Sequence, residues 1–280
     1  MTKRSGLIGN PVDHSLSPVM QEAAFRATGI AGTYELWPTE DADVPGRVAS
    51  LRDPNILGGN VTVPHKQRVM PEIDELSDTA RRIGAVNTIV NRDGHLLGDN
   101  TDAYGFALTV RSAGVDVPPA NRALVLGAGG AARAVIVALQ GLGFGTIEIS
   151  NRTPDRAVKM AAELDRSGQV EAVLWGDLET RLPQVDLLVN ATALGWHPGE
   201  LPLDIARIGL LPERATVVDL TYRDTDLLKI ARKLGLGAVD GLDMLIHQGA
   251  RAFELWTGVA PPIDAMRDAV TAEQARRATD

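Results

Sequence analysis

The chain has 280 residues, of which 44% are hydrophobic and 23% charged, as is usual for a globular protein that buries a core. This length and composition suggest about two domains and exclude a disordered or fibrous chain. The net charge of −8, without a run of lysine or arginine longer than a pair, argues against nucleic acid as a partner, because neutralised phosphates supply most of that affinity.

The first part of the chain alternates short apolar runs with helical patterns, which predicts a mostly parallel sheet built from βαβ units. We expect strands over residues 6–9, 32–37, 57–63 and 85–90, and helices over 18–28, 43–52, 71–83 and 104–113. The sequence Asn91-Arg92-Asp93-Gly94 after the last of these strands is typical of a hairpin turn.

A segment with two adjacent prolines, residues 115–121, is expected to link this part to a second unit. There we expect strands over residues 122–126, 146–150, 170–175, 186–190, 216–220 and 237–240, and helices over 131–142, 154–164, 227–234, 242–256 and 264–276. The alternation again favours an α/β fold with a parallel sheet.

The strongest local motif lies between the first strand and the first helix of this second unit. Residues 127–132, Gly-Ala-Gly-Gly-Ala-Ala, fit the pattern G-x-G-x-x-G/A of dinucleotide-binding folds. Gly127 permits the tight turn, Gly129 lets the backbone approach a pyrophosphate, and the helix N-terminus offers N–H groups to phosphates. A glycine-rich turn without a ligand is the alternative interpretation.

The end of the following strand indicates which dinucleotide is bound. A NAD site usually has an acidic residue about 20 residues after the first glycines, where it binds the ribose 2′-hydroxyl. Here the strand is followed by Asn151, Arg152 and Thr153, with Arg156 one turn further, and the nearest acid, Glu148, is in mid-strand. Arginine can bind the 2′-phosphate of NADP, so we expect NADP. A solvated turn capped by Thr153 is the alternative.

Polar side chains in the N-terminal part lie at expected strand ends and helix starts. Ser15 and Ser17 precede a helix, where a simple capping role is the alternative, and Asn60, Thr62 and Lys66 follow an apolar strand. Because ligands of open α/β sheets bind at the carboxyl ends of strands, these residues are candidates for a site. The chain has five lysines against 23 arginines, so a lysine in this position is notable.

Two further polar positions complete the candidate site. Asn87 lies inside an apolar run, and Asp102 stands immediately before a helix, where an N-cap role is the alternative. An ammonium–carboxylate couple of Lys66 with Asp102 would suit proton transfer. His14 and His65 flank these motifs, but structural roles are favoured for both.

Together these segments resemble the shikimate dehydrogenase family over nearly the whole chain. The motifs that carry the resemblance, in the family's order, are residues 6–11, 14–18, 60–66, 84–88, 98–102, 127–132, 151–153, 190–192 and 219–222, then Gly241 and Gln248. The resemblance implies reversible reduction of 3-dehydroshikimate to shikimate by NADPH, in aromatic amino-acid biosynthesis.

The resemblance also implies roles for individual residues, with Lys66 as the acid/base and Asp102 as its catalytic partner. The expected substrate-binding residues are Ser15, Ser17, Asn60, Thr62, Asn87, Asp102, Tyr222 and Gln248. The expected cofactor-binding residues are Asp78, Gly127, Ala128, Gly129, Gly130, Ala131, Asn151, Arg152, Thr153, Arg156, Leu220 and Gly241. Shikimate carries three hydroxyls and one carboxylate, so a pocket rich in neutral hydrogen-bonding groups is chemically consistent.

The predicted architecture is a two-domain α/β protein with the active site in the cleft between the domains. Residues 1–104 form the substrate domain, residues 105–239 a Rossmann-like NADP domain, and the helices of residues 240–280 pack back onto the first. Two departures from the family concern loop geometry: Trp196 stands where a methionine is frequent, and the segment after Tyr222 is short and lacks a proline.

Several other classes of site are excluded by composition. The chain has no cysteine, which excludes disulfides, thiolate catalysis and cysteine-bound zinc, and its five histidines lack metal-site spacing, so we predict no metal. The first ten residues lack the apolar core of a signal peptide, and no stretch approaches the ~18 uninterrupted apolar residues of a membrane span. We therefore expect a cytoplasmic protein with a small-molecule substrate and without nucleic-acid or membrane partners.

Two alternative functions stay open. One is a quinate/shikimate dehydrogenase of the same fold that uses NAD, which the missing acid after the strand at 146–150 argues against. The other is a binding or sensing protein without catalysis, which the presence of both Lys66 and Asp102 argues against. The assembly state is also open, with a homodimer as one candidate.

Overall fold

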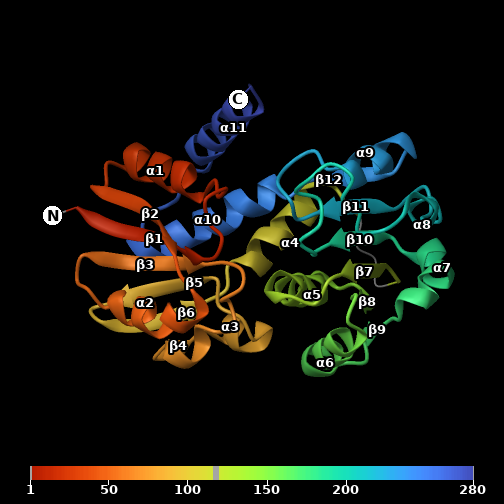
Figure 1. The fold of residues 1–280 in the computed structure, drawn as a ribbon, viewed down its shortest axis with the longest axis horizontal. Coiled ribbons are helices and arrows are strands. Elements are labelled where there is room, and N and C mark those ends of the chain that lie inside the picture. The colour runs from red at the N-terminus through yellow and green to blue at the C-terminus, as the bar shows by residue number, and fades with distance from the viewer. Residues whose placement is uncertain (1, 116–119, 280) are drawn as a thin grey trace. The chain divides into compact units, whose positions relative to one another are not determined.

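The computed structural model describes residues 2–115 and 120–279, so most of the expected linker at 115–121 lies outside the described residues (Figure 1). The chain forms two compact units. Unit 1 comprises Met1–Gly105 and Leu245–Asp280, and unit 2 comprises Phe106–Met244. No helix in the described ranges is both long enough and apolar enough to cross a membrane.

Unit 1 is built on a six-stranded sheet of order β2-β1-β3-β5-β6-β4. Its strands are β1 Lys3–Gly9, β2 Gly32–Pro38, β3 Ile56–Val61, β4 Glu75–Leu76, β5 Thr88–Arg92 and β6 His95–Asp99. The sheet is mixed: β1 pairs in parallel with β2 and β3, β4 pairs in parallel with β6, and β5 pairs antiparallel with β3 and β6.

The hairpin predicted between β5 and β6 is confirmed. Asp93 and Gly94 have φ values of 53° and 89°, and the Gly94 N–H donates to Asn91 Oδ1 at 2.8 Å. This turn reverses the chain and creates β6, a strand that the sequence did not predict.

The helices of unit 1 mostly follow the sequence pattern. They are α1 Ser17–Thr28, α2 Val44–Ser50, α3 Asp78–Ile83 and α11 Ile263–Thr279, while α4 Asp102–Ser112 and α10 Leu242–Thr257 each cross the boundary with unit 2. The helix expected over residues 71–83 is wrong. A short 3₁₀ turn and β4 come first, and α3 begins only after Ser77, which has extended dihedrals and accepts from the Ala80 N–H.

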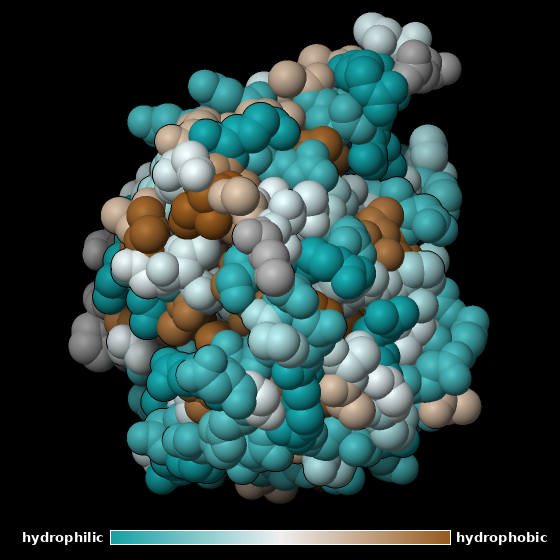
Figure 2. Space-filling model, turned by 90° about the vertical axis from the view of Figure 1, so that its left-hand side faces the viewer, coloured by the Kyte–Doolittle hydropathy of each residue, from teal (hydrophilic) through white to brown (hydrophobic). Residues whose placement is uncertain are grey.

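The core of unit 1 joins the sheet to helices from both ends of the chain. Ile8 and Ile89 on the strands are fully buried. The Trp256 Nε1 of α10 donates to the Ile89 carbonyl at 2.9 Å, and the Gln21 Nε2 of α1 donates to the Gly249 carbonyl at 2.9 Å. The face of the molecule in Figure 2 is mostly hydrophilic, with apolar side chains in separate groups, in keeping with apolar residues being used for this core.

Unit 2 is an entirely parallel sheet of order β12-β11-β10-β7-β8-β9. Its strands are β7 Arg122–Leu126, β8 Thr146–Ser150, β9 Val170–Ala172, β10 Leu187–Asn190, β11 Thr216–Asp219 and β12 Gly237–Val239. Its helices are α5 Gly130–Leu142, α6 Pro154–Leu164, α7 Leu178–Arg181, α8 Ile205–Ile208 and α9 Asp226–Lys233. Read from β9, the strand order is that of the doubly wound dinucleotide-binding fold, so the predicted α/β class is confirmed.

Glu148 in the middle of β8 is enclosed by unit 2 and is not available to a ligand. Its side chain is fully buried, and its Oε1 accepts from Arg122 Nη1 at 2.7 Å and from Arg181 Nη1 at 3.1 Å. Burial raises the pKa of the Glu148 carboxyl above its ordinary value, while the two arginines lower it less.

Candidate functional site

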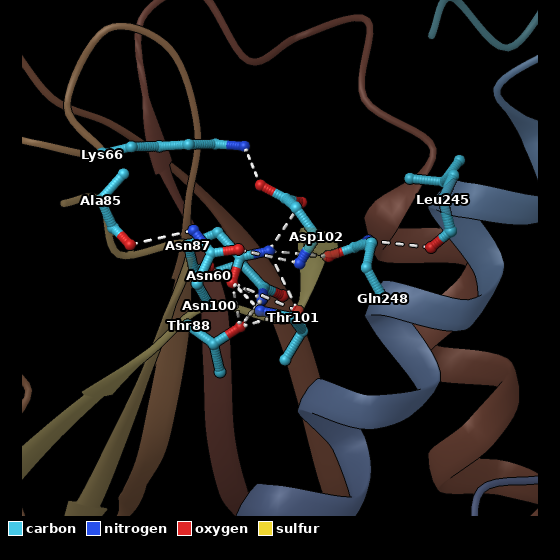
Figure 3. Close-up of polar contacts among 10 residues, drawn as sticks. All are labelled: Asn60, Lys66, Ala85, Asn87, Thr88, Asn100, Thr101, Asp102, Leu245 and Gln248. Atoms are coloured by element: carbon cyan, nitrogen blue, oxygen red, sulfur yellow. Dashed lines mark hydrogen bonds and ion pairs between the residues drawn. The ribbon is translucent and has the colours of Figure 1, made fainter. Parts of the chain in front are cut away.

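The expected acid/base couple forms in unit 1. Lys66, in the segment after β3, donates from Nζ to Asp102 Oδ2 at 2.6 Å (Figure 3). The side chains of Lys66 and Asp102 are only 14% and 7% exposed. The loss of water around a pair this close makes its charge-assisted hydrogen bond stronger than one in solvent.

Asn87 fixes the other oxygen of Asp102. The Thr101 backbone N–H can only donate, and it donates to Asn87 Oδ1 at 2.7 Å. The amide nitrogen of Asn87 therefore faces Asp102, and donates to its Oδ1 at 2.8 Å. Both carboxylate oxygens of Asp102 are thus bonded, one to the lysine and one to a neutral amide.

Asn60 supports this group through a second set of bonds. Its Nδ2 donates to the Asn87 carbonyl at 3.2 Å and to Thr88 Oγ1 at 3.1 Å, and its Oδ1 accepts from the Tyr34 hydroxyl at 2.8 Å. Burial raises the pKa of Tyr34 far above its ordinary value, an effect that a hydrogen bond with the Ser17 side chain partly offsets. Sequence reasoning missed Tyr34, which stands in β2 without any polar motif around it.

Gln248 comes to the same group from the far end of the sequence. Asn87 Nδ2 lies 3.4 Å from Gln248 Oε1, and Gln248 Nε2 donates to the Leu245 carbonyl at 2.8 Å. Figure 3 shows Gln248 pointing from α10 toward Asn87 and Asp102. The structure therefore brings five of the predicted residues into one bonded cluster, namely Asn60, Lys66, Asn87, Asp102 and Gln248.

The remaining predicted residues of unit 1 lie at the start of α1, just after β3 and at the start of α3. Ser17 is buried as the first residue of α1, and its N–H donates to Ser15 Oγ at 3.1 Å. Thr62 is half-buried, and its N–H donates to the Ile8 carbonyl at 2.8 Å. Asp78 is fully exposed and pairs with Arg81 at 2.8 Å.

His65, next to the catalytic candidate Lys66, has the structural role that the sequence favoured. It is buried, and its Nε2 lies 2.7 Å from the Thr39 carbonyl, which can only accept, so this nitrogen carries the proton. Across the described part of the chain, no group of three or more His, Cys, Asp or Glu side chains is arranged to hold a metal ion.

The glycine-rich turn of unit 2 has one closed side and one open side. Gly127 has φ 108°, and a Cβ there would lie 2.8 Å from the Ala191 carbonyl oxygen, so only glycine fits. Gly129 precedes α5 with extended dihedrals, and a Cβ there would meet nothing within 4 Å. The N-terminus of α5 and open space thus coincide, as a pyrophosphate requires.

Basic and polar groups surround the end of β8. Arg152, Thr153 and Arg156 are exposed, and Arg156 Nη2 lies 3.4 Å from the Ala128 carbonyl. Thr153 occupies the N-cap position of α6, but its side chain makes no capping bond. The capped-turn alternative for Thr153 is therefore not supported, and its hydroxyl is not committed to the helix.

The ends of β10 and β11 carry the last group of predicted residues. A Cβ at Gly241 would lie 2.1 Å from the Leu220 carbonyl oxygen, so the two backbones touch. The Tyr222 ring packs edge-on against Trp196 at 5.1 Å between centroids. Arg223 lies over the Trp196 ring at 5.8 Å and donates to the Trp196 carbonyl, so the two departures from the family contact each other.

Asp219, at the end of β11, is a buried carboxylate that bonds to the end of β10 and to the segment after Tyr222. The sequence analysis gave it no role of its own. Its Oδ1 accepts from Asn190 Nδ2 at 3.0 Å, and its Oδ2 accepts from Thr225 Oγ1 at 2.8 Å. The carboxyl is fully buried, and burial raises its pKa above the ordinary value. The signals for this arrangement were the position of Asp219 at the end of an apolar strand and its place in the motif at residues 219–222.

Family models match three parts of the chain. The shikimate dehydrogenase substrate binding domain matches residues 7–89, the shikimate / quinate 5-dehydrogenase model matches residues 115–195, and the shikimate 5′-dehydrogenase C-terminal domain matches residues 241–271.

Relatives match over nearly the full length. The shikimate dehydrogenase (NADP(+)) of Symbiobacterium thermophilum is 44% identical, with 95% of this chain and 93% of that protein covered. That of Rubrobacter xylanophilus is 45% identical, with 97% and 96% covered. The crystal structure of shikimate 5-dehydrogenase from Thermus thermophilus in complex with NADP(H) and shikimate has a TM-score of 0.86 and 41% identity, with 97% of this chain and 99% of that chain covered. The chain belongs to the shikimate dehydrogenase family.

Proposed function

We propose that this protein catalyses the reversible, NADPH-linked reduction of 3-dehydroshikimate to shikimate, a step of aromatic amino-acid biosynthesis. The observation that carries the proposal is the Lys66–Asp102 pair, at 2.6 Å, inside a cluster of neutral amide and hydroxyl groups. Such a cluster suits a substrate with several hydroxyls, and the pair supplies one positioned proton.

Lys66 is the acid/base group of the reaction. In reduction, its ammonium donates a proton to the oxygen of the former ketone as that oxygen becomes an alkoxide. In oxidation, the neutral amine accepts the proton from the substrate hydroxyl. Asp102 orients Nζ through the 2.6 Å bond and is itself oriented by Asn87.

The other predicted substrate residues hold and orient the ring substituents. Ser15, Ser17 and Thr62 offer hydroxyls, while Asn87 and Gln248 offer amides. Asn60 contributes through its bonds to Asn87 and Thr88, and Tyr222 is proposed to offer a phenol. The bonded cluster around Asp102 supports the roles of Asn60, Asn87 and Gln248, and the match of the substrate binding domain to residues 7–89 supports those of Ser15, Ser17 and Thr62.

NADPH, when bound, supplies the hydride. The residues of unit 2 fit this cofactor, because the space beside Gly129 and the N-terminus of α5 suit a pyrophosphate. Gly127 to Ala131 would hold the phosphates, Leu220 and Gly241 would line the nicotinamide, and Asp78 would make a further cofactor contact. We propose that the 2′-phosphate is bound by Asn151, Arg152, Thr153 and Arg156. Glu148 is buried, so no nearby carboxylate is available to bind a ribose 2′-hydroxyl in its place.

The proposal divides the work between the parts of the chain. Residues 1–104, with the helices of residues 240–280, form the substrate-binding catalytic domain, and residues 105–239 form the NADP domain. We propose the cytoplasm as the compartment of the reaction and a homodimer as the candidate assembly. Cell fractionation tests the compartment, and light scattering on the purified protein tests the assembly state.

The direct test is an assay of NADPH oxidation with 3-dehydroshikimate and of NADP⁺ reduction with shikimate. We expect turnover in both directions, and a strong loss in the Lys66→Ala variant. Parallel assays with quinate and with NAD⁺ distinguish this function from that of an NAD-dependent quinate/shikimate dehydrogenase of the same fold. Preferred turnover of quinate with NAD⁺ would replace the proposal, and cofactor binding without any turnover would make the protein a binding module.

A further inference from the structure

The C-terminal helix, α11, contacts the loop that carries Ser15 and leads into Ser17 at the start of α1. Arg277 of α11 donates from Nη1 to the His14 carbonyl at 2.8 Å, and its Nη2 lies 3.5 Å from the Ser15 carbonyl. These residues are more than 260 positions apart in sequence. Helix α11 packs against α1, at whose start the loop ends (Figure 1).

The loop has little regular structure of its own. Residues 10–16 belong to neither a helix nor a strand. Within the loop, the Ser15 N–H donates to the Val12 carbonyl at 3.0 Å, and the Ser17 N–H donates to Ser15 Oγ at 3.1 Å. The position of the Ser15 hydroxyl therefore depends on the local backbone, which Arg277 contacts at two successive carbonyls.

Arg277 is itself held in place by Glu273, one turn earlier on α11. Glu273 Oε1 accepts from Arg277 Nε at 2.7 Å, and the same carboxylate accepts from Arg276 Nη2 at 2.8 Å. Glu273 is 14% exposed, and the two guanidinium groups lower the pKa of its carboxyl to about 2. The carboxylate is thus ionised at neutral pH and fixes the plane of the Arg277 fork.

We propose that Arg277 is a positioning residue for the substrate: it holds the loop from His14 to Ser17 so that the two serine hydroxyls are set before the substrate arrives. This inference rests on the proposed function, which takes Ser15 and Ser17 as substrate-binding. A planar guanidinium that bonds two successive carbonyls fixes both the distance and the orientation of a loop, which a single ammonium does not. Preorganisation of this kind improves binding of the substrate and leaves the chemical step unchanged.

The test compares Arg277→Ala with Arg276→Ala. The control removes the neighbouring arginine from the same Glu273 carboxylate and leaves Arg277 on the loop. We expect Arg277→Ala to raise the KM for shikimate about three- to tenfold, a modest factor because this side chain is 38% exposed. The kcat and the KM for NADP⁺ should stay within about twofold of wild type, and Arg276→Ala should leave all three constants unchanged. Arg277→Lys should recover only part of the loss.

Two further measurements separate positioning from general stability. In a double-mutant cycle, Ser15→Ala and Arg277→Ala should be non-additive in the KM for shikimate, because one acts through the other. Amide hydrogen exchange over residues 12–17 should be faster in Arg277→Ala than in Arg276→Ala, whether or not any substrate is turned over. A lower Tm with unchanged KM and unchanged exchange would overturn the inference, as would additive effects with Ser15→Ala. Absence of shikimate turnover in the wild type would instead overturn the proposed function, with the exchange result still deciding whether Arg277 orders the loop.

Discussion

Lys66 is the residue whose removal should separate chemistry from binding most clearly. Proton transfer contributes to the transition state and little to the ground state, so Lys66→Ala should lower kcat by roughly 10²–10⁴-fold and change the KM for shikimate much less. Steady-state kinetics with shikimate and NADP⁺ measure both constants. Lys159, whose side chain is 79% exposed, offers the matched lysine control. A variant with wild-type kcat and only a raised KM would make Lys66 a binding residue.

Arg152 should determine the choice between the two nicotinamide cofactors. A charged hydrogen bond is worth about 1.5–3 kcal/mol, so Arg152→Ala should weaken NADPH by roughly 10- to 150-fold. NADH lacks the 2′-phosphate and should change little. The measurement is kcat/KM with each cofactor, and Arg166→Ala serves as a control on another exposed arginine of unit 2. An equal loss with both cofactors would remove Arg152 from the 2′-phosphate site.

The sequence predicted the residues of the cluster better than the bonds that hold them. Lys66 and Asp102 follow from their places after an apolar strand and before a helix, and the structure places them 2.6 Å apart. Tyr34 could not be found in this way, because its role depends on a contact between its hydroxyl in β2 and Asn60 in β3, two strands that are separated by β1. Arg277 is even harder to identify from the sequence, because nothing in its local sequence distinguishes it from the neighbouring Arg276.

At the scale of one turn, Gly127 and Gly129 should respond differently to the same added methyl group. Gly127→Ala places a Cβ at φ 108° and 2.8 Å from a backbone oxygen, so it should lower the free energy of unfolding by roughly 2–5 kcal/mol. Gly129→Ala has room and an unstrained backbone, so the protein should keep its stability. Its methyl group would occupy the space proposed for the pyrophosphate, at a cost of about 1–3 kcal/mol, or roughly 5- to 150-fold in the Kd for NADPH.

Urea unfolding and NADPH titration of both variants check this contrast. The interpretation of the turn as a phosphate site fails if Gly129→Ala binds NADPH as tightly as wild type. The interpretation of Gly127 as a backbone contact fails if its alanine variant unfolds at the wild-type urea concentration.

Elements fixed by local pattern were predicted well, and those fixed by distant pairing were not. The strand Thr146–Ser150 and the helix Pro154–Leu164 match their predicted bounds, because a buried parallel strand and a proline-started helix carry their own signals. The error at 71–83 arises where Glu75–Leu76 pairs with β6. Two residues of strand leave no periodicity, so only the partner strand reveals them.

For the whole molecule, acid should unfold the protein over a definite range of pH. Glu35, Asp74 and Glu273 have ordinary pKa values of 4.5, 3.8 and 4.5, and paired arginines lower all three to about 2 in the fold. Because the folded pKa is below the unfolded one, each group adds stability above its ordinary pKa, and this is lost as the pH falls toward 2. The urea midpoint should therefore fall steadily between about pH 5 and pH 2.

Two buried carboxyls act with the opposite sign. Burial raises the folded pKa of Glu148 and Asp219, so their ionisation costs stability, and that cost disappears as the pH falls through the folded values.

The contribution of the Glu35 pair to acid unfolding can be tested directly. The measurement is the urea midpoint at each pH for the wild type and for Glu35→Gln. The urea midpoint of Glu35→Gln should fall less than that of the wild type between pH 5 and pH 2. Parallel curves would show that the Glu35 pair makes no contribution.

The division of the chain also sets an order of events at the ribosome. Unit 2 is one continuous stretch, Phe106–Met244, whereas unit 1 is interrupted by it and is completed only by Leu245–Asp280. The nascent chain can therefore complete the dinucleotide-binding fold of unit 2 before unit 1 is fully synthesised. Unit 1 is still without Gly249 and Trp256 at that point, and without the bonds that they make to α1 and β5. A polypeptide released before Leu245 would lack Gln248 and Arg277 alike. The cell would obtain a cofactor-binding fragment from it, with the substrate half left unfinished.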